Sequence, residues 1–250
     1  MTTLYLLQRS WTSTGVTDFT YVGSELKLFA AACNWKSYWS RQIRPFITGD
    51  VIEVGAGIGS NTPFLDPGGN ERWVCLEPDS LLIAQLTKNL KQTTGHRRYE
   101  TLCGTLKTLD ADQRFHTIIY IDVLEHIEND REELNIAACR LRPGGRIIVL
   151  SPAHQWLSTP FDAAIGHFRR YNRPMLRSIS PTGLRLERAI YLDSAGLAAS
   201  AANLLLRQSM PTKEQLRFWD QWIIPVSRVL DKLLLYSVGK SIVAVWRRTQ

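Results

Sequence analysis

The stretch Asp50-Val51-Ile52-Glu53-Val54-Gly55-Ala56-Gly57-Ile58-Gly59-Ser60-Asn61 decides the fold of this chain. Its apolar first half predicts a buried parallel strand, and three glycines at every second position follow at once. Because glycine accepts a positive φ and has no Cβ, such a loop can turn sharply and lie directly against a ligand. Glu53, two positions before the first glycine, suits a ligand with a cationic or hydroxyl-rich part.

The second half of the signature lies one strand further along the chain. Residues 72–76 predict the next buried strand, and Glu77 closes it, 22 residues after Gly55. An acidic residue about 20 residues after a glycine loop commonly binds a ribose hydroxyl. The alternative, a tight strand-to-helix turn without a ligand, does not account for this carboxylate at the strand end.

The glycine spacing distinguishes two cofactors. Dinucleotide enzymes favour G-x-G-x-x-G, where a helix N-terminus receives a pyrophosphate. Here the pattern is Glu53-x-Gly55-x-Gly57-x-Gly59, which resembles the first motif of class I S-adenosylmethionine (SAM)-dependent methyltransferases of the small-molecule type. SAM carries a sulfonium and an ammonium and no phosphate, so an acidic residue beside the loop is electrostatically favourable.

Length and composition fit one large α/β domain. The chain has 250 residues, of which 44% are hydrophobic, enough for a complete core. Its net charge of +7 would attract nucleic acid, anionic lipid or an acidic substrate without selecting among them, and a solvated basic face is the ordinary explanation. The N-terminus lacks the pattern of a signal peptide, and no run of 18 apolar residues is present, so we expect a cytoplasmic protein.

Four cysteines are present, and none forms a C-x-x-C pair. Cys75 and Cys103 fall in predicted strands, so we expect reduced thiols buried in the core rather than disulfides. No metal site is expected from the sequence.

Strands and helices alternate five times between residues 46 and 151, which predicts a doubly wound, Rossmann-like parallel sheet with helices on both faces. The resemblance implies seven strands, mostly parallel, in the order 3-2-1-4-5-7-6 with the last strand antiparallel. Residues 184–191 and 241–246 would be the final pair.

The whole chain, 1–250, is predicted to form one methyltransferase domain. Residues 1–45 would be an N-terminal helical cap, with one aromatic-rich helix over 21–39, and residues 46–151 the SAM-binding core. Residues 152–180 would form an acceptor-site loop, and residues 194–239 a helical lid inserted before the last strand.

The resemblance implies that SAM contacts residues at the strand ends. Tyr21 and Trp35 are candidates from the aromatic-rich cap helix, with ordinary core packing as the alternative. Gly104-Thr105 departs from the aspartate that many relatives carry at that place. The predicted contacts are Tyr21, Trp35, Glu53, Gly55, Ala56, Gly57, Gly59, Asn61, Glu77, Pro78, Gly104, Thr105, Leu106, Asp122, Val123 and His126.

The acceptor must lose a proton before or after methyl transfer, and a histidine suits that task near pH 7. His126, His154 and His167 are the candidate bases, although each could instead stabilise a loop through hydrogen bonds. Arg169 and Arg170 could hold an anionic group or form salt bridges within the domain. The remaining candidates of the same loop are Trp156, Asp162 and Tyr171.

The segment 222–236 has apolar residues at helical spacing, with charged residues opposite. It predicts a lid over an aromatic or apolar acceptor. Docking on a membrane or forming a homodimer through these C-terminal helices are the alternatives.

Taken together, the sequence predicts a methyltransferase that moves the SAM methyl group by SN2 displacement to an oxygen or nitrogen of a small, aromatic or apolar molecule. The alternatives are a non-catalytic SAM-binding accessory protein and a methyltransferase of lipid or glycan at a membrane surface. A nicotinamide oxidoreductase would share the glycine loop, but Tyr236-x-x-x-Lys240 lies beyond the predicted sheet core. No nucleic-acid partner is expected, because no Asn-Pro-Pro-Tyr-type motif follows the fourth strand.

Overall fold

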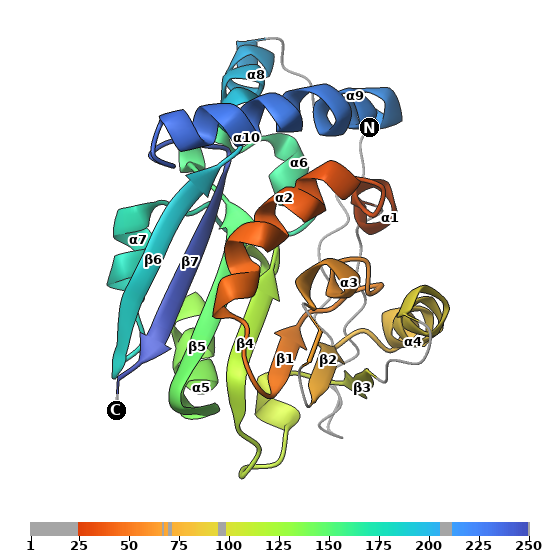
Figure 1. Cartoon of the computed structure of the whole chain (residues 1–250), viewed down its shortest axis with the longest axis vertical. Coiled ribbons are helices and arrows are strands. Elements are labelled where there is room, and N and C mark those ends of the chain that lie inside the picture. Colours follow the sequence, from red (N-terminus) through yellow and green to blue (C-terminus); the bar gives the residue numbers. More distant parts are fainter. Residues whose placement is uncertain (1–24, 67, 70–71, 95–98, 206–211, 250) are drawn as a thin grey trace, which may run out of the picture.

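A central seven-stranded sheet organises the molecule (Figure 1). The computed structural model describes residues 25–249 except 67, 70–71, 95–98 and 206–211. The strand order is β3-β2-β1-β4-β5-β7-β6, with β7 antiparallel to both its neighbours and the other pairs parallel. The predicted fold class and strand order are therefore confirmed.

The strands have the bounds β1 Val51–Val54, β2 Trp73–Glu77, β3 Glu100–Cys103, β4 Phe115–Ile121, β5 Leu141–Pro152, β6 Leu184–Leu192 and β7 Ser241–Arg248. Strands β2, β1, β4 and β5 are mostly buried. Their alternate residues belong to two separate cores, one on each face of the sheet. Ile52, for example, belongs to one core and its neighbour Val51 to the other. Burial on both faces is what their continuous apolar runs predict.

The helices cover both faces of the sheet. One core includes residues of α5 (Asp130–Cys139) and α7 (Arg173–Ser178). The other includes residues of α2 (Cys33–Ile43), α3 (Thr62–Leu65), α4 (Ser80–Thr94) and α10 (Ile224–Leu233). Shorter elements are α1 (Glu25–Phe29), α6 (Pro160–Ala164) and the single turns η1 Arg44–Phe46, η2 Leu106–Thr108, η3 Leu124–His126 and η4 Gln155–Leu157.

Two local predictions are wrong. The cap helix is broken between α1 and α2, because the chain turns at Ala30 and Ala31. Cys103 is exposed, as are Cys33 and Cys139, and of the four cysteines only Cys75 is a buried thiol.

The insertion between β6 and β7 consists of α8 (Ser194–Leu205), α9 (Lys213–Phe218), the π-helical segment η5 (Trp219–Ile223) and α10. Two of its carboxylates fasten it to helix N-termini, where unpaired backbone N–H groups are available. Asp220 accepts hydrogen bonds from the amides of Asn34 and Trp35 at the start of α2 (3.2 and 2.8 Å). Asp231 accepts from the amides of Asp193 and Ser194 at the start of α8 (2.7 and 2.9 Å). The insertion is therefore attached to α2 and held together internally by specific polar bonds.

None of the helices in the described part of the chain is long and apolar enough to span a bilayer.

Candidate functional site

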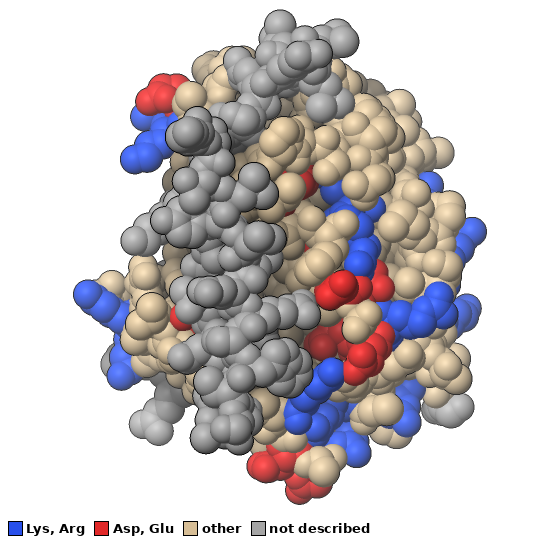
Figure 2. Space-filling model, turned by 180° about the vertical axis from the view of Figure 1, so that it is seen from behind, with Lys and Arg blue, Asp and Glu red and all other residues tan. Residues whose placement is uncertain are grey.

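The carboxyl ends of the parallel strands open into one large cavity of about 1790 Å³. Such an edge is where ligands bind in open α/β sheets. Its walls come from the glycine loop, β2, the segment after β4, the loop around α6, and helices α2, α8 and α9. Seen from behind, the molecule carries charges of both signs in a band across its middle and lower parts (Figure 2).

The glycine loop is built to meet a ligand closely. Gly55 and Gly57 have left-handed backbones (φ 66° and 57°), a conformation in which other residues are strained. A Cβ on Gly55 would lie 2.6 Å from a methyl group of Val123, so only glycine fits there. Gly57 lines the cavity, and among the described residues a Cβ there would meet only the Leu26 side chain, at 3.6 Å, leaving its backbone open to a ligand.

Glu77 is held in place by the same loop. Its Oε2 accepts a hydrogen bond from the Gly57 amide (2.8 Å), and its Oε1 accepts one from the Asp79 amide (3.1 Å). Burial raises the pKa of Glu77, while these two amide bonds act against that rise. Each carboxylate oxygen keeps a second lone pair for a ligand hydroxyl. The loop and the acid thus form one unit, as their spacing in the sequence indicates.

Most of the predicted cofactor contacts are brought together in this cavity. Tyr21 lies outside the described residues. Glu53, Gly59 and Leu106 are described but do not line the cavity. A Cβ on Gly59 would lie 2.7 Å from Leu86, so this glycine serves the packing of the loop on α4. The residues that line it are Trp35, Gly55, Ala56, Gly57, Asn61, Glu77, Pro78, Gly104, Thr105, Asp122, Val123 and His126.

Glu53 is buried beneath the glycine loop. It accepts a hydrogen bond from the Thr62 hydroxyl (2.7 Å). Burial raises the pKa of Glu53 to about 7, against the hydrogen bond from Thr62, the nearby Trp73 and the charge of Lys36. A carboxyl whose pKa rises on folding favours the folded state below its unfolded pKa, near 4.5, and that stabilisation is lost as the pH rises to 7.

We therefore expect Glu53→Gln to remove a pH-dependent loss of stability. As the pH rises from 4.5 to 8, the free energy of unfolding of the unsubstituted chain should fall by about 2 to 3 kcal/mol more than that of Glu53→Gln. Urea unfolding across this pH range measures the difference, with the exposed Asp112→Asn as the control. Parallel pH profiles for Glu53→Gln and the unsubstituted chain would show that Glu53 does not titrate in this way.

Lys36 is a cavity residue that the sequence did not single out. Its ammonium donates to the Ser60 carbonyl oxygen at the end of the glycine loop (3.0 Å). Burial lowers the pKa of Lys36 to about 8, with Cys33, Asp122, Glu53 and Asp220 opposing the change. A cation buried beside the loop can pair with an anionic ligand group. The sequence signal that could have identified Lys36 was its position on the inner face of α2, the helix that packs over β1.

Of the three candidate histidines, two lie in the cavity. His126 and His167 both line it, with ring centroids 4.5 Å apart. His154 does not line it and stacks instead on Tyr191, at 4.9 Å between ring centroids. Burial, together with the neighbouring His167, lowers the pKa of His126 to about 4. His126 is therefore a weak base at neutral pH.

His167 is oriented by a buried carboxylate. Its Nδ1 lies 3.0 Å from Asp162 Oδ1. Asp162 also accepts two hydrogen bonds from Arg170, at 2.7 and 3.0 Å. Burial acts to raise the pKa of Asp162, but the bonds from His167 and Arg170 outweigh it and hold that pKa well below its usual range. Because an ionised carboxylate only accepts, Nδ1 carries the proton and Nε2 is left to act as a base.

Glu125 lies opposite that free nitrogen. Its Oε1 is 3.9 Å from His167 Nε2, too long for a hydrogen bond, and has no hydrogen-bond partner among the described residues. Its Oε2 accepts from the Ser151 hydroxyl (2.8 Å). Burial and the neighbouring Asp122 raise the pKa of Glu125 well above its usual range. A hydroxyl oxygen to the side of the pair could lie about 2.8 Å from both atoms.

Comparison with known proteins places this site in a family. Residues 52–147 match the model of a methyltransferase domain. Residues 52–147 therefore carry a methyltransferase domain. The ubiquinone biosynthesis O-methyltransferase of Bradyrhizobium sp. (strain ORS 278) is 28% identical to it over 109 residues, which are 43% of this chain and 42% of that protein. The chain thus spans less than half the length of this curated relative.

Solved structures support the fold of the methyltransferase domain. Magnesium protoporphyrin IX methyltransferase from Synechocystis PCC 6803, solved with bound SAM, has a TM-score of 0.55 and 11% identity, covering 92% of this chain and 93% of that one. The [4+2]-cyclase SpnF has a TM-score of 0.59 and 12% identity, covering 91% and 95%. Because the same fold also serves a cyclase, the reaction must be argued from the site.

The cavity also brings three potential metal ligands together, although the sequence predicted no metal site. Glu125, His126 and His167 each offer one ligand atom, and these atoms all lie within 4.8 Å of one another, so the trio could hold a metal ion. The sequence signal was the adjacent Glu125 and His126 directly after β4.

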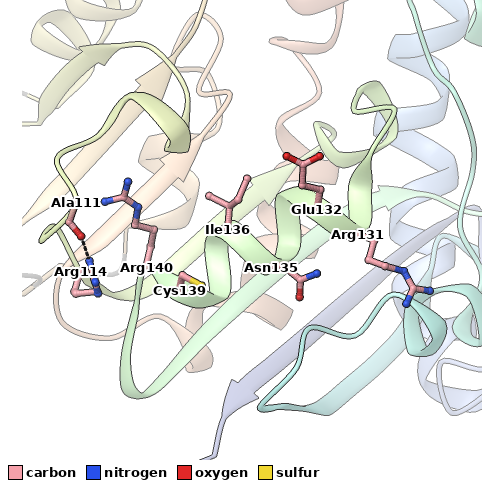
Figure 3. Close-up of a pocket in the computed structure, with 8 residues that line it drawn as sticks. All are labelled: Ala111, Arg114, Arg131, Glu132, Asn135, Ile136, Cys139 and Arg140. Carbon is pink, nitrogen blue, oxygen red and sulfur yellow. Dashed lines mark hydrogen bonds between the residues drawn. The ribbon is translucent and has the colours of Figure 1, made fainter.

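A second, smaller hollow of about 600 Å³ lies beside α5 (Figure 3). Three arginines line it, but each donates to backbone carbonyl oxygens. Arg114 donates to Ala111, Arg131 to Ser178, and Arg140 to Asp110, Leu106 and Leu109. These guanidinium groups tie loops of the methyltransferase domain together.

Proposed function

We propose that this protein is a SAM-dependent O-methyltransferase that acts on a phenolic hydroxyl of a small, largely apolar acceptor. The observation that carries this proposal is the cavity in which a glycine loop with its bound acid faces the Asp162–His167 pair. The similarity to an O-methyltransferase supports oxygen as the methylated atom.

The residues around the glycine loop fit the parts of SAM. The lone pairs left on Glu77 would accept the two ribose hydroxyls, as an acid at this offset does. The open backbone at Gly57 allows close approach, and Lys36 would pair with the amino-acid carboxylate. Asp122 lies at the end of β4, and burial raises its pKa to about 6, against the fields of His167 and Lys36. Ionised at neutral pH, it would favour the cationic part of the cofactor.

When bound, SAM supplies a methyl group on an already activated sulfonium, so the protein has to provide alignment and proton removal. We place the acceptor hydroxyl between His167 and Glu125. His167 Nε2 takes its proton, while the neutral Glu125 holds the oxygen. The new O–C bond forms as the C–S bond breaks, the electron pair stays on sulfur, and the proton ends on His167.

The walls near this point favour an apolar acceptor. Leu157, Phe161 and Ile165 line the cavity from the loop that carries His167. Leu216 and Phe218 of α9 line it from the lid. Aromatic and aliphatic walls with a few polar groups are typical of small-molecule sites.

Incubation of the purified protein with SAM labelled on its methyl group and a panel of phenols, catechols and amines tests the proposal. Transfer of label to hydroxyl compounds, with a mass gain of one methylene, is the expected result. Transfer to amines alone would overturn the choice of oxygen. SAM binding without transfer to any acceptor would favour the non-catalytic accessory protein.

A second candidate, metal-assisted methylation, is suggested by the trio of Glu125, His126 and His167. In that case a chelator such as EDTA should abolish transfer, and an added divalent cation should restore it. The base mechanism expects the same rate with and without the chelator.

A further inference from the structure

Helices α9 and α10 carry an outward apolar stripe that the methyltransferase site does not explain. The segment from Lys213 to Leu233 is helical without a break, through η5, and is about 30 Å long. It runs along one end of the molecule, away from the sheet (Figure 1).

The outward face of this long helix is unusually apolar. The residues that face the domain are of both kinds, the apolar Leu216 and Ile224 and the buried polar side chains of Asp220, Ser227 and Asp231. The residues that face outward are apolar and recur after four, four, three and four positions, which places them on one face. A helix on the surface of a soluble domain normally has the opposite arrangement. The outward residues are Phe218, Trp222, Val226, Val229 and Leu233.

These side chains are strongly exposed. Phe218 is 58% exposed, Trp222 66% and Leu233 74%. The stripe continues into the turn after α10, where Leu235 is 82% exposed and both Leu235 and Tyr236 adopt left-handed backbones. Such a backbone is unfavourable for a residue with a Cβ, and here it presents a leucine to the exterior. An apolar patch of this kind marks an interaction surface.

Charge indicates what covers the stripe. Between residues 213 and 235 the exposed charged side chains are Lys213, Glu214, Arg217 and Lys232, three cationic and one acidic. Seen from behind, a group of charges of both signs is visible at this end of the molecule (Figure 2). Apolar residues with a tryptophan and flanking cations are typical of a helix that lies in the interface of an anionic membrane.

A second copy of the chain fits less well. In a symmetric pair, the two stripes would pack antiparallel about a point near Val226, because an isologous contact repeats itself. Lys232 of each copy would then lie opposite position 220 of the other, within one helical turn (about 5 Å) of Arg217. Like charges this close disfavour the arrangement, whereas an anionic bilayer favours both cations.

We propose that the stripe formed by α9, η5 and α10 docks this protein peripherally on an anionic phospholipid membrane. Phe218 both begins the stripe and lines the cavity, so the cavity lies next to the docking face. An apolar acceptor could then reach the site from the bilayer. Vesicle binding requires neither cofactor nor acceptor, so its outcome is independent of the catalytic proposal.

Flotation of the full chain with vesicles tests the docking. We expect binding to phosphatidylcholine vesicles that contain about one third phosphatidylglycerol, and little binding to phosphatidylcholine alone. The double variant Trp222→Gln/Leu233→Gln should lower the partition coefficient at least about tenfold, because two apolar side chains leave the lipid. Leu81→Gln, an equally exposed leucine on α4, is the matched control and should bind as the unsubstituted chain does.

A second pair of substitutions tests the role of charge. Arg217→Gln/Lys232→Gln should remove most of the preference for anionic vesicles. The partition coefficient on these vesicles should fall about fivefold for each charge removed. Thermal unfolding and S-adenosylhomocysteine binding show that each variant is folded. The absence of vesicle binding, or equal binding by the stripe variant, would overturn the proposal. A dimer in light scattering that the stripe variant dissociates, without vesicle binding, would assign the stripe to a second copy.

Discussion

Glu77→Ala should weaken S-adenosylhomocysteine binding about 100-fold or more while the domain stays folded. The substitution removes the acceptor for the ribose hydroxyls and also releases the amides of Gly57 and Asp79. Hydrogen bonds to a charged group contribute about 1.5 to 3 kcal/mol each, and two of them correspond to this loss of affinity. Isothermal titration of the purified variant measures it.

Two further variants of the same unit sharpen this result. Gly57→Val should weaken binding to a similar extent, since valine disfavours a φ of 57° and its side chain would occupy the space above the loop. Glu100→Ala is the control, because this exposed carboxylate ends no strand at the cavity and pairs with Arg72. Affinity within twofold of the unsubstituted chain for both loop variants would contradict the placement of the cofactor.

His167→Gln should lower the rate of methyl transfer by about 10² to 10⁴ without changing S-adenosylhomocysteine affinity, since a positioned general base contributes that much. Glutamine can still bond to Asp162 but cannot take the acceptor proton. The rate is measured with the best acceptor found in the labelled-SAM panel.

The other two histidines serve as comparisons for that variant. His154→Gln should leave the rate close to that of the unsubstituted chain, because His154 stacks on Tyr191 outside the cavity. His126→Gln should lower it less than His167→Gln does, because its depressed pKa makes it a weak base. A His167→Gln enzyme as fast as the unsubstituted one would remove His167 from the mechanism.

The fold could be predicted from the sequence because its signals are local. The apolar runs of β1 and β4, the glycine loop and the helix stops all depend on neighbours in the chain. The strand order followed from the resemblance carried by the Glu53–Gly59 motif. The break between α1 and α2 was missed, because Leu26, Phe29, Ala30 and Cys33 continue through it at roughly helical spacing.

The site was only partly predictable, since its chemistry depends on long-range contacts. Glu77 was identified by its offset from Gly55, but Glu53, with similar local features, is turned under the loop by its bond to Thr62. The choice among the three histidines required the partner of each ring. His167 differs from the others by its contact with Asp162, five residues earlier in the chain, which only a folded turn brings within 3.0 Å.

The apolar C-terminal segment shows the same limit. Its periodicity predicts a helix with one apolar face, and the ordinary interpretation packs that face inward. In the structure Asp220 and Asp231 face inward, because they accept backbone hydrogen bonds at the starts of α2 and α8. No local pattern indicates those partners, which lie about 185 and 37 residues away along the chain.

The most direct test of the central claim is calorimetric titration of the purified chain with S-adenosylhomocysteine, with NADH titrated in parallel. We predict micromolar binding of S-adenosylhomocysteine and no binding of NADH, because the loop at Gly57 and the acid at Glu77 accept a nucleoside without a pyrophosphate site. Binding of NADH with no binding of S-adenosylhomocysteine would contradict this account.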